Sequence, residues 1–70
     1  MPQPNWSAVA PRFREARKAA GLSVFETSQR AGVRPHSIYA YETGETEPKT
    51  LTFLALCIVY GIDPRELVAA

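Results

Sequence analysis

The sequence predicts an all-α domain built from five short helices. No segment alternates apolar and polar residues with the period of two that is typical of a strand. Serine, threonine, aspartate and proline recur where helices would begin, and glycine recurs where they would end. Of the 70 residues, 46% are hydrophobic, which is enough for a folded core and argues against a disordered chain.

The first helix is expected to follow an extended N-terminal arm, residues 1–6, which contains two prolines. Ser7 can cap this helix with its hydroxyl group, and Gly21 can end it. Pro11 complicates the start, because proline belongs in a first turn and disfavours helix at the residue before it. The helix is therefore expected to begin between Ser7 and Pro11, within a domain that spans residues 7–70.

The second and third helices are separated by a short turn. Ser23 and Glu26 have the spacing of a capping box, and Gly32 is expected to end the second helix. Pro35 suits the first position of the third helix, where its missing N–H costs nothing, and Gly44 is expected to end it. Two short helices joined by a tight turn that contains glycine indicate a helix-turn-helix motif.

The fourth helix, capped by Thr50 and ended by Gly61, is apolar nearly all round. A helix that is hydrophobic on every side should be buried on every side, so part of it is expected to face a second copy of the chain or to lie beneath the fifth helix with Leu67 and Val68. Asp63 and Pro64 supply the cap and the first-turn proline of a fifth helix. The residues predicted to form a homodimer interface are Leu51, Leu54, Ile58, Leu67 and Val68.

Composition argues against several classes of function. No apolar run approaches the roughly 20 residues of a membrane-spanning helix, and the N-terminus lacks the pattern of a secretory signal. The single cysteine, Cys57, cannot form an internal disulfide and is expected to serve in packing, so a reducing cytoplasm is the default. One histidine and no metal-binding cluster leave nothing from which to build a catalytic site. We therefore expect no enzyme activity, metal, cofactor or small-molecule ligand.

Four segments of the chain match the pattern of a known family. They are "AAGLS" at 19–23, "AGV" at 31–33, "IYAYETGETEP" at 38–48 and "FLALCIVYGIDPREL" at 53–67. The most specific part is Glu42-x-Gly44-x-x-x-Pro48. Together these segments resemble the XRE family, the helix-turn-helix domains of the lambda-repressor and Cro type. The resemblance covers residues 8–67 and implies a compact five-helix fold of that type.

The resemblance also implies a transcriptional regulator that binds double-stranded DNA, with the third helix in the major groove. Arg34 is expected to reach a phosphate or a guanine edge, and Tyr39 offers a hydroxyl group or a ring against a thymine methyl. Arg34 as a solvated loop residue and His36 as an uninvolved surface residue are the alternatives. The residues expected to contact DNA are Val24, Arg34, Pro35, His36, Ser37, Tyr39, Ala40 and Thr43, with Arg30 and Lys49 on phosphates.

Other matches to the family concern structure. Arg17 and Glu42 match a pair that joins the first and third helices by a salt bridge. Thr27 stands where the family tends to have an apolar residue, and its hydroxyl group can bond back to the preceding helical turn. Tyr41 is expected in the core, and Trp6 either holds the N-terminal arm against the domain or marks an arm that reaches along DNA.

Two interpretations of function remain open. The first is a repressor of the phage Cro or repressor type, a homodimer that occupies a near-palindromic operator with its recognition helices about 34 Å apart. Such a protein would act in the bacterial nucleoid or in the cytoplasm of a phage-infected host. The second is an antitoxin-like or coactivator-like XRE domain whose main partner is another protein. The apolar fourth helix and the net charge of only +1 favour this alternative.

Overall fold

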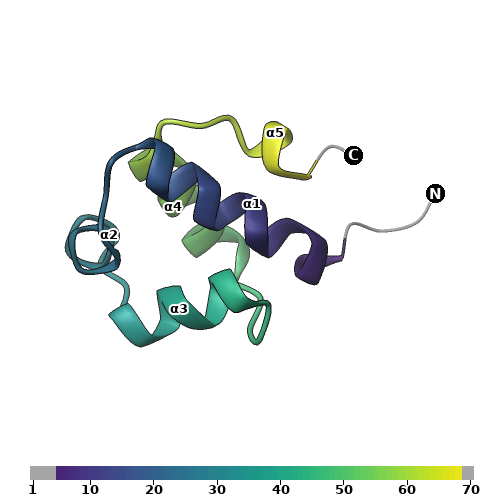
Figure 1. The fold of residues 1–70 in the computed structure, drawn as a ribbon, viewed down its shortest axis with the longest axis horizontal. Helices are drawn as coiled ribbons and strands as arrows, with labels where there is room; N and C mark the ends of the chain where they lie inside the picture. The colour runs from purple at the N-terminus through teal and green to yellow at the C-terminus, as the bar shows by residue number, and fades with distance from the viewer. Residues whose placement is uncertain (1–4, 69–70) are drawn as a thin grey trace.

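The computed structural model describes residues 5–68, and in this part of the chain the backbone forms five α-helices and no strand. α1 crosses the middle of the molecule, with α3 on one side of it, α5 on the other and α2 at one end (Figure 1). The predicted all-α, five-helix domain is confirmed, and no helix in the described range is long and apolar enough to cross a membrane. The helices are α1 (Trp6–Ala19), α2 (Val24–Ala31), α3 (Pro35–Thr43), α4 (Thr50–Tyr60) and α5 (Pro64–Val68).

α1 begins earlier than the sequence predicts. Asn5 is its N-cap and accepts a hydrogen bond from the backbone N–H of Ser7 at 3.1 Å, so the prediction that Ser7 caps this helix is wrong. Trp6 is already helical, and the rest of the predicted arm, residues 1–4, lies outside the described residues. Pro11 lies inside the helix and faces solvent, although it cannot donate the hydrogen bond that the helix interior requires.

Trp6 holds the start of α1 against the core. Its indole Nε1 donates to the carbonyl oxygen of Tyr41 at 2.9 Å. Its ring packs edge-on against Phe13 and Phe53, with centroid separations of 5.3 and 6.0 Å. These contacts favour helix at residues 6–10 and offset the roughly 3 kcal/mol that an interior proline costs. Of the two roles considered for Trp6, the structure supports the one that fixes the N-terminal segment to the domain.

Most other helix ends lie where the caps predict. The hydroxyl group of Ser23 accepts from the backbone N–H of Glu26 at 3.0 Å, and the carboxylate of Glu26 accepts from the N–H of Ser23 at 3.1 Å. Gly44 ends α3 in the left-handed region, with a φ of 83° that other residues rarely adopt. The N-cap of α4 lies one residue before the predicted position: Lys49 occupies it, and Thr50 is the first helical residue.

The core lies where the inner faces of the helices meet α1. Phe13, Ile38 and Leu56 are fully buried, and Cys57 is buried beside them, in agreement with its predicted packing role. Leu67 is only 2% exposed, so its assignment to a dimer interface is wrong. α5 folds back onto α1 and turns this leucine inward, where it joins the hydrophobic core of its own chain.

Two buried hydroxyl groups on α2 and α4 lack a hydrogen-bond partner in the structure, those of Thr27 and Tyr60. The prediction that the Thr27 hydroxyl group bonds back to the preceding helical turn is wrong. Thr27 lies close enough to Tyr60 to influence the pKa of the phenol, but outside hydrogen-bond geometry. Burial dominates and raises the pKa of Tyr60 to about 12. Burial likewise raises the pKa of the Cys57 thiol to about 11.

Stability is expected to fall as pH rises from about 9 to about 12. In this window the folded chain keeps protons on Cys57 and Tyr60 that the unfolded chain, with pKa values near 9.0 and 10.0, has lost. The free energy of unfolding therefore decreases with increasing pH. Tyr60→Phe should flatten the decline between pH 10 and 12 and, because it removes an unpaired hydroxyl group, should raise stability at pH 7 by about 1 kcal/mol. Urea unfolding across pH measures both, and an equally steep decline in the variant would contradict this role of Tyr60.

Candidate nucleic-acid interface

α3 presents one exposed side to solvent along its whole length. Arg34 is its N-cap, with extended backbone and no side-chain cap hydrogen bond, so the guanidinium projects from the turn. Pro35 occupies the first helical position, as predicted. His36, Tyr39 and Thr43 are exposed and recur at the spacing that places side chains on one helix face. The structure therefore brings a cation, a histidine and two hydroxyl groups onto one surface.

The remaining predicted contacts divide into exposed and buried positions. Ser37 is half-buried at the edge of this surface, while Arg30, in the last turn of α2, and Lys49, at the start of α4, are exposed. Val24 and Ala40 are 8% and 7% exposed, so the prediction that their side chains contact DNA is wrong. Val24 belongs to the hydrophobic core, and its apolar side chain is the sequence signal that indicated this.

A buried ion pair fixes α3 to α1. Arg17 donates from Nε to Glu42 Oε2 at 2.7 Å and from Nη2 to Glu42 Oε1 at 3.1 Å. Its Nη1 donates to the carbonyl oxygen of Leu22 at 2.8 Å, which also ties down the turn between α1 and α2. The hydrogen bonds to Glu42 raise the pKa of the Arg17 guanidinium. The pair implied by the family resemblance is confirmed, and its role is structural.

One cation beside α3 was not selected from the sequence. Arg14 is exposed on α1, one turn before Arg17. It lines a hollow of about 310 Å³ together with the ion pair and with Tyr39 and Thr43 of α3. The signal for Arg14 was its spacing of three residues from Arg17, since that spacing places the two arginines on neighbouring parts of one face of α1.

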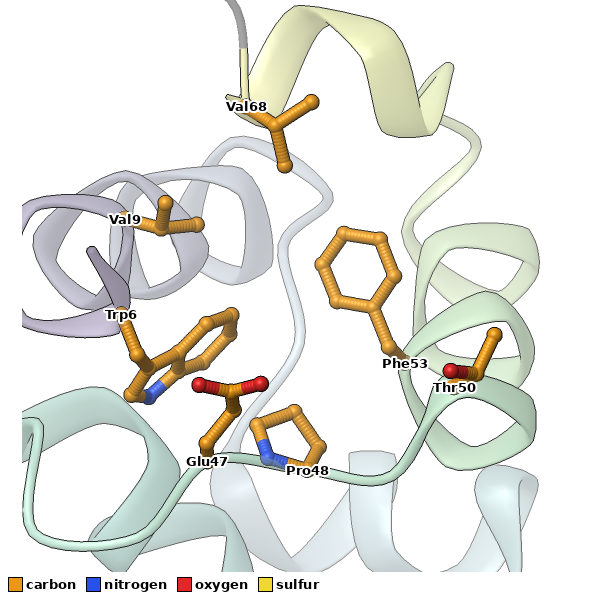
Figure 2. Close-up of a pocket in the computed structure, with 7 residues that line it drawn as sticks. All are labelled: Trp6, Val9, Glu47, Pro48, Thr50, Phe53 and Val68. Atoms are coloured by element: carbon orange, nitrogen blue, oxygen red, sulfur yellow. The ribbon is translucent and has the colours of Figure 1, made fainter. Parts of the chain in front are cut away.

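A second hollow lies at the other end of α1. Trp6 and Phe53 face each other across it, with Glu47 and Pro48 on one side and Val68 on the opposite side (Figure 2). Its volume, about 170 Å³, is below the roughly 300 Å³ at which small-ligand pockets begin. Among residues 5–68, no group of three or more His, Cys, Asp or Glu could hold a metal ion.

Comparisons with known proteins agree with this geometry. Residues 8–70 match the family model described as a helix-turn-helix domain. The restriction-modification controller protein C.AhdI from Aeromonas hydrophila is similar in structure, with a TM-score of 0.82, 29% identity, and coverage of 89% of this chain and 94% of that chain. The clp gene regulator ClgR from C. glutamicum has a TM-score of 0.86 and 20% identity, covers 96% of this chain and 87% of its own, and shows the fold alone. No curated protein sequence matches the chain.

Removing one partner of the buried ion pair is expected to destabilise the domain strongly. Glu42→Gln or Arg17→Met leaves an unpaired buried charge and should lower the free energy of unfolding by about 3 kcal/mol. The double variant Arg17→Met/Glu42→Leu leaves no buried charge and should recover part of that loss. Urea unfolding of the single and double variants measures the coupling, and additive losses would show that the two side chains do not act as a pair.

Proposed function

The chain belongs to the helix-turn-helix domain family, as an XRE-type member, and we propose that it is a sequence-specific, double-stranded-DNA-binding transcriptional regulator. The observation that carries the proposal is the exposed face of α3, a helix held by a buried ion pair and open to solvent from Arg34 to Thr43. An α-helix fits the major groove, which is about 12 Å wide. We further propose that the protein is a repressor of the phage Cro or repressor type, which acts by occupying its operator.

The first turn of α3 is proposed to read the bases. Recognition helices of this kind contact bases with their N-terminal residues, which here are Arg34, Pro35, His36 and Ser37. Arg34 suits a guanine edge, because its paired N–H groups match the O6 and N7 acceptors. Thr43 is short, and its hydroxyl group already donates to the carbonyl oxygen of Ala40 at 3.2 Å, so base reading rests on the first turn.

The affinity for DNA is expected to depend steeply on salt concentration. Substitutions at different residues are expected to affect either base preference or overall affinity. If about six phosphates are neutralised, the logarithm of the binding constant should fall with the logarithm of salt concentration at a slope near −5. Arg34→Ala and His36→Ala should relax base preference, whereas Arg30→Ala and Lys49→Ala should weaken binding to all sequences alike. Selection from a randomised duplex library, followed by anisotropy titrations, measures both effects. A flat salt response would contradict groove binding.

We also propose that two copies bind DNA together through α4. Leu51, Leu54 and Ile58 are 81%, 38% and 79% exposed and form one stripe of this helix. α4 contains no charged residue, so packing against its own copy about a two-fold axis brings no like charges together. Val68 belongs to α5 and lines the same hollow as Phe53. Phe53 lies on a different face of α4 from the stripe, so Val68 is left out of the proposed interface.

Ile58→Lys is expected to yield a monomer, because it places a charge in the proposed interface at a residue that is 79% exposed in the single chain. Phe25→Lys is the matched control, since Phe25 is 62% exposed on α2 and lies outside the stripe. Sedimentation velocity should give twice the 7.7 kDa chain mass for the wild type and the control, and the single mass for Ile58→Lys. A monomeric wild type at high micromolar concentration would overturn the homodimer. The exposed stripe of α4 would then favour the antitoxin-like alternative, in which a different protein binds there.

A further inference from the structure

The hollow between α1 and α3 has the composition of an anion site. It is lined by Arg14 and Arg17 from α1 and by Tyr39, Glu42 and Thr43 from α3. Its volume of about 310 Å³ reaches the lower end of the range for small-ligand pockets, so it has room for a phosphate group and water. The lining comes from two helices that the buried ion pair holds together, so the hollow is already formed in the free protein.

The hollow carries one uncompensated positive charge. Arg17 and Glu42 neutralise each other in their ion pair, with Nε and Oε2 2.7 Å apart. Arg14 is exposed and makes no ion pair within residues 5–68. An anion that enters the hollow therefore meets the unpaired guanidinium of Arg14 beside an ion pair with no net charge. The paired N–H groups of a guanidinium match two oxygens of one phosphate.

Tyr39 supplies the second donor. It is 57% exposed, and its hydroxyl group makes no hydrogen bond to the described part of the chain. Thr43 cannot serve in the same way, because its hydroxyl hydrogen is already directed to the carbonyl oxygen of Ala40. Arg14 and Tyr39 are thus the two residues of the hollow that can donate to an anion.

We propose that Arg14 and Tyr39 together bind one backbone phosphate of the duplex whose major groove receives α3. This inference rests on the proposed DNA-binding function and extends the contact surface to α1. Tyr39 then fixes the register of the protein on DNA and does not read a base, because phosphate contacts position a protein without carrying sequence information.

The length of α3 favours a DNA phosphate as the anion. Its 9 residues span about 13 Å, close to the roughly 12 Å width of the major groove. A helix that enters the groove by its N-terminal end therefore has its C-terminal half near the sugar–phosphate backbone. Tyr39 is the central residue of α3 and Thr43 its last residue, and both line the hollow with Arg14.

Arg14→Gln in the full chain tests the site, with a mixed-sequence duplex of about 20 base pairs, two helical turns, as the probe. The variant should bind about tenfold more weakly, and its slope of log binding constant against log salt should be less steep by about 0.9. Arg12→Gln is the matched control. It removes the same charge from the same helix, but Arg12 donates from Nη1 to the Leu67 carbonyl oxygen at 3.3 Å, on the α5 side of α1. Its slope should equal that of the wild type.

Tyr39→Phe separates a phosphate contact from base reading. Loss of the hydroxyl group alone should weaken binding to all members of a randomised duplex library alike and leave the selected sequence unchanged. A changed base preference in Tyr39→Phe, or an unchanged salt slope in Arg14→Gln beside a salt-dependent wild type, would overturn the phosphate site and leave the proposed function standing. A wild-type chain that binds no duplex would overturn both.

Discussion

The ion pair between Arg17 and Glu42 is the constraint on which the arrangement of this domain depends. It joins α1 to α3 across a buried contact, and the third hydrogen bond of Arg17, to the carbonyl oxygen of Leu22, fixes the turn that leads into α2. Two charges out of water are tolerated only when both are paired and hydrogen-bonded, and here the guanidinium and the carboxylate are matched in two bonds. One interaction therefore sets the position of the exposed helix relative to the rest of the chain.

A second set of contacts compensates for the small size of the domain. A chain of 70 residues buries only about 60% of its unfolded surface, so each aromatic contact matters. The rings of Trp6, Phe13, Phe53 and Tyr60 form one cluster that links α1 to α4. Because Trp6 also donates to the carbonyl oxygen of Tyr41, the same cluster holds the C-terminal half of α3, at the end opposite the turn.

The surface proposed to bind DNA follows from these two anchors. With α3 fixed on its inner side, its outer side is left to solvent, and buried residues alternate along this short helix with the exposed residues that are proposed to contact DNA. Ile38 and Glu42 point inward, whereas His36 and Tyr39 point outward. The buried hydroxyl groups of Thr27 and Tyr60, on α2 and α4, are the side-chain polar groups of the described core that lack a hydrogen-bond partner.

The sequence by itself determined the number of helices, their order and most of their ends, because a capping residue or a left-handed glycine acts on the backbone within one turn. The box formed by Ser23 and Glu26 and the start of α3 at Pro35 are of this kind. Only the tertiary structure decided how segments distant in the sequence pack against one another. It turned the apolar Val24 inward, extended α1 back across Pro11 and placed Arg14 beside α3. Those outcomes depend on packing between distant segments, which capping residues and turn glycines do not specify.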